Sequence, residues 1–436
     1  RRKKSMKRAQ LKNSLTLDPC TEYANGVVNG EIVAGPDVIA ACARHLDDLE
    51  NASKRGWTWN TENVARIIDY FSHVLRLNGG QFEGVPFDVL SWQAFILGSI
   101  FGWVDKYGNR RFKVAYIETA KGSGKSPLAA GIGLYGLTSD NEPRAEIYAA
   151  ATKKDQAMIL FRDAIAMHDL SPELSKRLTK SGRGEQAWNL AFRKQGSFFR
   201  PISADDGQSG PRPHISLLDE VHEHKTGNVV EMLKAGQKSR RQPLMFMITN
   251  SGTNKKLVCW EYHEYGQNVS AGTIEDDTFF AYICSLDDGD DPFNDESCWI
   301  KVNPSLDAGI PGYDYIRQQV REARGMPSKE SIFKRLNFCI WTESDNAWIG
   351  KTQWVNAIEK EFDEKLLLNR TCYGGLDLSS TTDLTALVLL FSPNAIDKFW
   401  RLKSYFWIPE VGLSEKEKKD KVPYTAWRDK GYLFTT

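Results

Sequence analysis

The sequence predicts an α/β protein built around a parallel sheet. One observation is a short apolar strand, 114–117, followed by a loop of small residues and a helix that opens with Pro127. Proline suits the first helical turn, where its missing N–H is not needed. A second observation is that apolar strands alternate with helical stretches, as in a parallel sheet. The further predicted strands are 146–152, 198–203, 214–218 and 244–248, and a predicted helix covers 154–168.

The loop after the first strand has the composition of a phosphate-binding loop. Its glycines let the backbone approach a ligand, and the following helix N-terminus favours negative charge. Lys125 is predicted to reach the β- and γ-phosphates of ATP, and the Ser126 hydroxyl to hold Mg²⁺. The common pattern has glycine at position 119, where this chain has Thr119, and the loop carries a basic Lys121. The predicted nucleotide-binding residues of the loop are Gly122, Ser123, Gly124, Lys125 and Ser126.

Two later strands end in polar residues that complement such a loop. The strand from residue 214 ends in Asp219 and Glu220. Asp219 is predicted to hold the Mg²⁺ shell, and Glu220 to polarise the attacking water. The strand from residue 244 ends in a turn predicted to lie near the γ-phosphate and to report its hydrolysis. The residues of this coupling turn are Thr249, Asn250 and Ser251.

A Trp-Gln-x-Phe element precedes the phosphate loop. The amide of Gln93 has a donor and an acceptor, which suits adenine. An ordinary amphipathic helix explains the same residues. Upstream, 36–50 and 61–77 have helical spacing of apolar residues, with Asn60 or Thr61 as the cap of the second helix. These two helices are expected to pack on the core without chemistry of their own.

Bulk composition narrows the class of protein. The chain has 436 residues, 41% of them hydrophobic and 26% charged, with a net charge of +1. A nucleic-acid contact must therefore come from local patches, such as the seven basic residues within 1–12. The seven cysteines are scattered singly, which fits an intracellular protein without disulfides. No stretch is long enough to span a bilayer. His222 and His224 do not share a helical face, so no metal site is predicted there.

The composition shifts near Arg370. Residues 371–391 predict a strand, a polar turn and a second strand, and 403–408 predict a third strand. Asp377 lies on the first of these strands among apolar residues, and Asp383 opens the second. A carboxylate placed like Asp377 is a candidate ligand for a catalytic divalent ion.

Taken together and in this order, the motifs resemble those of the large terminase subunit of tailed double-stranded DNA bacteriophages. The motifs are Trp92-Gln-x-Phe95, the loop with Lys121 before Gly-Lys-Ser, Leu217-Leu-Asp-Glu220, Ile248-Thr-Asn-Ser-Gly252, Arg335-Leu-Asn-Phe338 and Gly375-Leu-Asp-Leu-Ser-Ser-Thr-Thr-Asp-Leu-Thr-Ala386. Each is weak alone, and the ordered set is specific.

The resemblance implies a genome-packaging motor. An N-terminal ATPase would drive double-stranded DNA into a procapsid, and a C-terminal RNase H-like nuclease would cut concatemeric DNA. Gln93 matches an adenine-reading glutamine, Lys121 a residue contacting the γ-phosphate, and Asp377 the first nuclease acid. The implied cofactors are ATP with Mg²⁺, and Mg²⁺ or Mn²⁺ at the nuclease site. The implied partners are DNA, the portal protein, the procapsid, the small terminase subunit and further copies in a ring, in the host cytoplasm.

Five segments are expected. Residues 1–80 form a tail and helices, 81–270 a P-loop ATPase core of RecA/ASCE-like type, and 271–345 a small lid. A linker over 346–370 leads to the start of an RNase H-like domain, 371–436. The chain stops before the family's later nuclease acids, and cutting with two metals needs several carboxylates. The nuclease domain is therefore expected to be incomplete.

Two other functions fit parts of the sequence. Asp219-Glu-Val-His222 has the D-E-x-H form of a helicase, although no Gln/Gly/Arg cluster follows residue 252. A nucleotide-binding structural or portal-docking subunit without catalysis is the third reading, which Glu220 disfavours. The arginine that assists hydrolysis stays open. The candidates for it are Arg144, Arg162, Arg200 and Arg212.

Overall fold

The computed structural model describes residues 18–203, 210–342, 351–359, 363–379, 384–420 and 422–436. The basic residues within 1–12 and Asp383 lie outside these ranges. The chain divides into two compact units, 1–351 and 352–436. Among the described residues, no helix is both long and apolar enough to cross a membrane.

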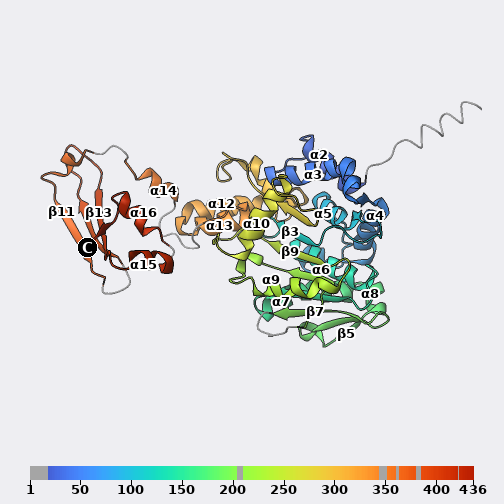
Figure 1. Ribbon diagram of the computed structural model, residues 1–436. Helices are drawn as coiled ribbons and strands as arrows, with labels where there is room; N and C mark the ends of the chain where they lie inside the picture. The colour runs from blue at the N-terminus through green and yellow to red at the C-terminus, as the bar shows by residue number, and fades with distance from the viewer. Residues whose placement is uncertain (1–17, 204–209, 343–350, 360–362, 380–383, 421) are drawn as a thin grey trace, which may run out of the picture. The chain divides into compact units, whose positions relative to one another are not determined.

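An eight-stranded sheet forms the centre of the first unit (Figure 1). Its strand order is β10-β3-β9-β8-β4-β7-β6-β5, and the first six strands are parallel to one another. The last two add antiparallel pairs at one edge. The predicted parallel α/β sheet is confirmed. The strands are β3 (Val114–Glu118), β4 (Glu146–Ala151), β5 (Thr179–Ser181), β6 (Asn189–Phe192), β7 (Ser197–Ser203), β8 (Ile215–Leu218), β9 (Leu244–Thr249) and β10 (Phe279–Ile283).

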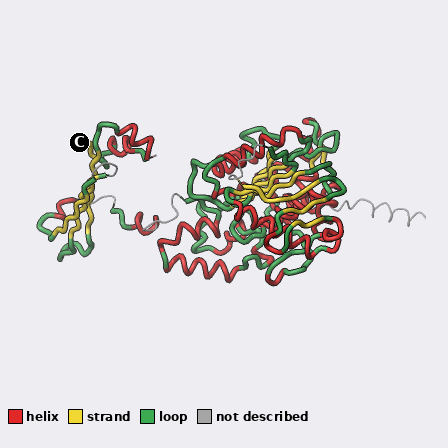
Figure 2. Tube along the Cα trace, turned by 90° about the horizontal axis from the view of Figure 1, so that it is seen from below, coloured by secondary structure: helices red, strands yellow, loops and turns green. Residues whose placement is uncertain are grey.

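Helices cover both faces of this sheet, as Figure 2 shows. Alternate strand residues point to opposite faces, so Ala115 and Ile117 join one hydrophobic cluster and Tyr116 joins the other. The first cluster includes α2–α7, and the second includes α9 and α10. The bounds are α2 (Pro19–Val28), α3 (Pro36–Asn51), α4 (Thr61–Asp69), α5 (Ser91–Gly102), α6 (Lys125–Thr138), α7 (Lys154–Leu170), α8 (Pro172–Arg177), α9 (Asn228–Gly236) and α10 (Val258–Ser270).

Helix α6, which follows the phosphate loop, lies unusually close to the sheet. A Cβ added to Gly133 would be 2.7 Å from Phe199, and one added to Gly136 would be 2.3 Å from Ile215. Larger residues at these positions would push the helix away from the strands. The glycines therefore fix the distance between the helix N-terminus and the ends of the neighbouring strands.

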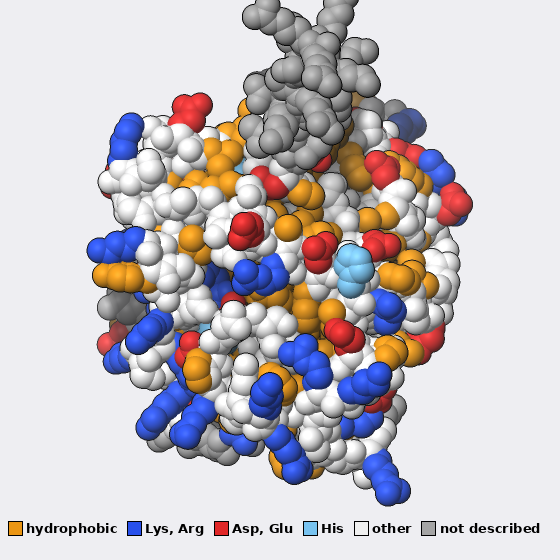
Figure 3. All heavy atoms as spheres, turned by 90° about the vertical axis from the view of Figure 1, so that its right-hand side faces the viewer, with side chains coloured by type: hydrophobic (Ala, Val, Ile, Leu, Met, Phe, Trp, Pro, Cys, Tyr) orange, Lys and Arg blue, Asp and Glu red, His pale blue; other side chains and the backbone are white. Residues whose placement is uncertain are grey.

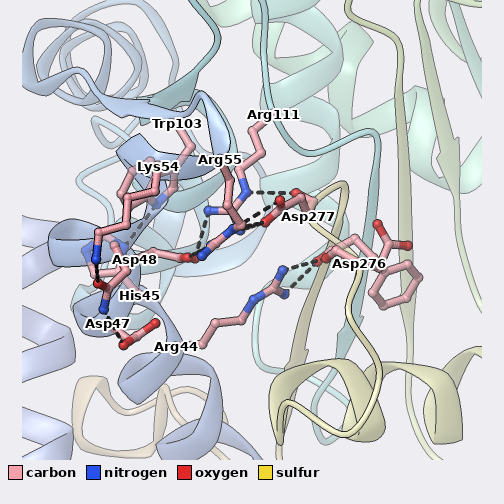
Figure 4. A network of polar contacts seen from close by, with 12 residues as sticks. Arg44, His45, Asp47, Asp48, Lys54, Arg55, Trp103, Arg111, Asp276 and Asp277 are labelled. Carbon is pink, nitrogen blue, oxygen red and sulfur yellow. Dashed lines mark hydrogen bonds and ion pairs between the residues drawn. The ribbon is translucent and has the colours of Figure 1, made fainter.

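The N-terminal helices are joined to the sheet by a buried ionic network (Figure 4). The Arg111 side chain is fully buried and donates to Asp48 on α3 and to Asp277 before β10, each at 2.7 Å. Arg55 contacts the same two carboxylates from the surface. Nearby, Arg44 donates to the carbonyl oxygens of Asp276 and Phe279. Asn60 accepts a hydrogen bond at the N-terminus of α4, as one of the two predicted caps.

The expected boundary at residue 271 does not fit the structure. Strand β10 lies within the segment expected to be a lid, but it pairs with β3 as part of the main sheet. An apolar strand does not reveal its partner from sequence, because strand pairing is non-local. The rest of the expected lid contains α11 (Trp299–Val302), α12 (Tyr313–Gly325) and α13 (Glu330–Phe338).

The second unit contains a four-stranded sheet in the order β11-β12-β13-β14. The first three strands are antiparallel and β14 is parallel to β13. A small apolar cluster holds the helices to β13, whereas every residue of β11 is exposed. The elements are α14 (Lys351–Asn356), β11 (Cys372–Asp377), β12 (Thr385–Phe391), β13 (Arg401–Ile408), α15 (Leu413–Asp420), α16 (Tyr424–Asp429) and β14 (Phe434–Thr435).

Candidate active site

The loop between β3 and α6 has the backbone of an anion cradle. Gly122 and Gly124 have φ values of 87° and 91°, a region that favours glycine. The N–H groups of Ala120 and Lys121 donate to the carbonyls of Val302 and Leu336, at 3.1 and 2.8 Å. Within the described part of the chain, the N–H groups of residues 122–124 have no recorded partner. These N–H groups fit phosphate oxygens.

Lys125 lies at the mouth of this cradle. Its Nζ donates to the carbonyl oxygens of Thr119 and Ala120, at 2.8 and 3.0 Å. Burial lowers the pKa of Lys125, and the negative charge of Glu220 opposes that shift. An ammonium held by neutral carbonyls can exchange them for phosphate oxygens, which form stronger charge-assisted bonds.

The phosphate loop and the acidic strand end meet in one site. The Ser126 hydroxyl donates to Asp219 Oδ2 at 3.2 Å. Asp219 Oδ1 accepts from the backbone N–H of Glu220 at 2.8 Å. Burial raises the pKa of Asp219, while the Glu220 N–H and Lys125 oppose this shift. A hydroxyl and a carboxylate in contact are the oxygen ligands that Mg²⁺ prefers.

Glu220 has a strained backbone beside this pair. Its φ of 47° is in the left-handed region, which is uncommon for residues other than glycine. Burial and the charge of Asp219 raise the pKa of Glu220, against the effect of Lys125 and Lys121. Glu220 Oε2 is buried and has no hydrogen bond among the described residues. Its nearest ionisable neighbour is His222, and the oxygen can still accept a hydrogen bond from a water or a ligand.

His222 connects Glu220 to the coupling turn, a role that the sequence did not reveal. Its Nδ1 lies 3.3 Å from Glu220 Oε2 and 3.1 Å from Thr249 Oγ1. Its backbone N–H also donates to Thr249 Oγ1 at 3.1 Å. The D-E-x-H spacing was the only signal, and it pointed to a helicase. Both ring nitrogens of the buried His224 have no hydrogen bond in the described structure.

The coupling turn is fully buried and connects two neighbouring segments. The Thr249 carbonyl accepts from the N–H of Thr119 at the start of the phosphate loop, at 3.2 Å. Ser251 Oγ lies within hydrogen-bond distance of the Arg335 and Ile340 carbonyls, at 3.0 and 3.3 Å. Asn250 is 1% exposed between them. A shift of this turn would therefore reach both the loop and the segment after α13.

A second buried group, at the end of β3, adjoins this turn. The carboxylate of Glu118 accepts from Tyr116 at 2.8 Å and from Trp341 Nε1 at 3.0 Å, and His263 Nδ1 lies 2.8 Å away. Burial alone would lower the pKa of His263, but the charge and hydrogen bond of Glu118 raise it above its usual value. Trp341 also packs on Gly252. Trp341, near the C-terminal end of the first unit, is thus held in place beside the coupling turn.

Gln93 is placed at the phosphate loop, on α5. Its Oε1 accepts from the Leu90 N–H at 2.9 Å, and its Nε2 would be 3.6 Å from a Cβ on Gly124. Beside it, Trp92 donates to Ser305 Oγ, which donates to the Ser123 carbonyl. Trp92 lines a cavity of about 500 Å³ whose other walls include Tyr282, Lys301 and Tyr313. A cavity of this volume is of the size that holds small ligands.

Asp377 ends β11 in the second unit and is exposed. Among the described residues, no group of three or more His, Cys, Asp or Glu side chains is arranged to hold a metal ion. Asp377 is therefore a single carboxylate without described partners. The site residues of the first unit, by contrast, converge on one loop.

Comparison with known families decides what kind of protein carries this site. The family model "Terminase large subunit, ATPase domain" matches residues 91–268, and "Terminase large subunit, endonuclease domain" matches 273–436. Both describe one protein, and together they span well over half of the chain. The chain belongs to the large terminase subunit family. The endonuclease match of this terminase begins before β10, although β10 and the helices after it lie in the first structural unit.

Two curated relatives and a solved structure are similar to this chain. The terminase large subunit of Enterobacteria phage HK97 is 27% identical over 329 residues, covering 74% of this chain and 62% of that protein. Protein YmfN of Escherichia coli (strain K12) is 25% identical over 234 residues, covering 52% and 51%. This terminase chain thus spans 62% and 51% of these relatives' lengths. The crystal structure of the HK97 large terminase has a TM-score of 0.55 at 23% identity, covering 86% of this chain and 74% of that chain, which shows a shared fold.

Proposed function

We propose that the chain is an ATP-driven motor that moves double-stranded DNA into a procapsid and cuts concatemeric DNA with a metal-dependent endonuclease. The contact between Ser126 and Asp219 carries the motor part of this proposal, because it brings the phosphate loop and the acidic strand end into one site. The partners are the portal, the procapsid, the small terminase subunit and further copies of the chain in a ring. The protein would act in the host cytoplasm.

Each side chain of the site has a distinct task in ATP hydrolysis. Bound Mg²⁺ would neutralise charge on the phosphates. Ser126 and Asp219 would hold this ion, and Lys125 would contact the β- and γ-phosphates. Glu220 would orient the attacking water and accept its proton, for which a raised pKa is suitable. Lys121, whose charge acts on Glu220, would stabilise the γ-phosphate as it leaves.

The nucleoside would lie on the Gln93 side of the phosphate loop. Because Gln93 Oε1 is engaged with Leu90, its Nε2 is the atom left to contact the base. The cavity lined by Trp92, the neighbour of Gln93 in sequence, has aromatic walls that would suit a base. The coupling turn, Thr249 to Ser251, would then respond to loss of the γ-phosphate through its contacts with His222 and Thr119.

The Glu220→Gln variant tests the ATPase assignment. ATP turnover is expected to fall by about 10²–10⁴-fold, because the variant lacks a general base, while ATP affinity changes little. Phosphate release and binding of a fluorescent ATP analogue measure the two quantities. Glu231→Gln, an exposed change on α9, is the matched control. Unchanged turnover in the Glu220 variant would remove this residue from the mechanism.

The Asp377→Ala variant tests the nuclease assignment. In the full-length protein, DNA cutting in Mg²⁺ or Mn²⁺ is expected to be lost, because a ligand of the catalytic ion is gone, with ATP turnover near normal. Cleavage of a linear duplex, with and without a chelator, is the measurement. Asp429→Ala removes an exposed carboxylate from the same unit as a control. Cutting that survives Asp377→Ala would make Asp377 structural.

A further inference from the structure

A row of cations lies along the edge of the main sheet that is remote from the phosphate loop. Arg241, Arg212, Arg144 and Lys194 each precede a strand by two or three residues, namely β9, β8, β4 and β7. These strands are neighbours in this order and parallel, so they begin at one edge. Neighbouring strands lie about 4.8 Å apart, which makes the row about 14 Å long.

Contacts between the turns hold this row in place. The N–H of Arg144 donates to the Gln195 carbonyl at 3.1 Å. Arg240 donates to the carbonyls of Arg144 and Arg212, both at 3.0 Å. Arg144 itself has a φ of 53°, where glycine would be less strained. The chain thus keeps a charged side chain at a position that its backbone geometry disfavours.

The cations of the row are not neutralised by nearby carboxylates. Glu142 and Glu146 pair with Arg240, at 3.0 and 3.8 Å, and Asp140 pairs with Arg110. Within the described residues, no ion pair involves the exposed residues Arg144, Arg193, Lys194, Arg212 and Arg241, which we call the basic row. Figure 3 shows many Lys and Arg side chains on the lower half of the face of the first unit that it draws.

We propose that the basic row binds the phosphate backbone of duplex DNA. This proposal rests on the proposed function and adds a contact surface to it. A row of about 14 Å is comparable with the width of the major groove, about 12 Å, so its charges can reach phosphates on both sides. Cations that contact phosphates carry no sequence information, as a motor moving along any sequence requires. The net charge of only +1 makes this local excess distinctive.

The row is separated from the nucleotide site of its own subunit. The phosphate loop follows the carboxyl end of β3, whereas the row precedes the amino ends of its neighbours. Strands of four to seven residues separate the two edges by about 13–23 Å. Arg144 and Arg212, two candidates for assisting hydrolysis, therefore lie too far away to serve their own ATP.

The double variant Arg193→Glu/Lys194→Glu tests the proposal in the full chain. Binding of a fluorescein-labelled duplex of random sequence is measured by anisotropy over a range of salt concentrations. We expect the Kd to rise at least tenfold relative to wild type. Each lost phosphate contact lowers the slope of log K against log salt by about 0.9, so the slope falls by about two. Lys54→Glu/Lys106→Glu, an equal charge change on exposed lysines that form no ion pair among the described residues, is the control and retains wild-type binding.

Arg144→Gly is a second variant with little risk to folding, because glycine suits the observed φ. It is expected to weaken duplex binding about threefold or more without lowering the unfolding temperature. Affinity and salt slope equal to those of the control would overturn the proposal. So would intact duplex binding together with loss of ATP turnover or of portal binding, since the row would then serve a neighbouring nucleotide site or an acidic protein. A wild-type chain that binds no duplex even at low salt would overturn the proposed function itself.

Discussion

At the scale of single residues, the site combines groups that the sequence marks with groups that it does not. Lys125, Ser126, Asp219 and Glu220 belong to short local patterns whose chemistry requires those side chains, and the structure brings them together around one loop. The roles predicted for them stay predictions. Ser305 belongs to no such pattern, and the D-E-x-H spacing of His222 did not indicate its contacts with Glu220 and Thr249.

His222 is expected to affect turnover rather than nucleotide binding. It contacts Glu220 and Thr249, and among the described residues no hydrogen bond or ion pair joins it to the phosphate loop, where Lys121 and Lys125 act on it only through their charge. In His222→Ala, kcat should fall about tenfold, equivalent to about 1.4 kcal/mol, while the KM for ATP stays within about twofold. Steady-state ATP hydrolysis separates the two parameters.

His168→Ala is the matched control, since His168 is also buried but lies on α7, where its ring contacts Asp169 and not a residue of the site. The control should lose stability at most and keep the kcat of the folded protein. Equal kcat values in the two variants would show that His222 only fills space.

At the scale of elements, buried charge rather than surface charge fixes the N-terminal helices to the sheet. Arg111 is fully buried between two carboxylates, whereas the side chain of Arg55 is 41% exposed beside the same pair. Arg111→Ala should lower the free energy of unfolding by about 3–5 kcal/mol, because it leaves uncompensated buried charge. Arg55→Ala should cost about 0–1 kcal/mol, because solvent screens its pairs. Denaturant unfolding of both variants measures the difference, and equal losses would contradict it.

The positions of the strands and helices were predicted better than the pairing of the strands into sheets. Strands β3, β4, β7, β8 and β9 follow from apolar runs between turn signals, and the start of α4 follows from its cap. The pairing of β10 with β3 could not be predicted from the sequence, because the five apolar residues of β10 do not indicate which strand they pair with. The antiparallel pairs of β5 and β6 were missed for a related reason. β5 has three polar residues and β6 has only four residues, so neither is long enough to show a clear alternation.

At the scale of the whole first unit, one buried pair makes stability depend on pH. The pKa of His263 is raised by Glu118, so the folded state binds a proton more tightly than the unfolded chain. The stabilisation is complete below the usual histidine pKa of about 6.5. It disappears as the pH rises through the higher pKa of the folded state.

Urea unfolding followed by tryptophan fluorescence between pH 6 and 9 tests this dependence. The free energy of unfolding should decrease over this range in the wild type. The decrease should be smaller in His263→Gln, which keeps a polar side chain but does not titrate. Parallel curves for the two proteins would show that His263 is neutral in the folded state.

The fastening of Trp341 to Glu118 and Gly252 has a consequence for the chain that continues beyond it. Trp341 contacts Glu118, at the end of the strand that leads into the phosphate loop, and Gly252, which follows the coupling turn. A movement of the coupling turn during ATP hydrolysis would therefore also displace Trp341.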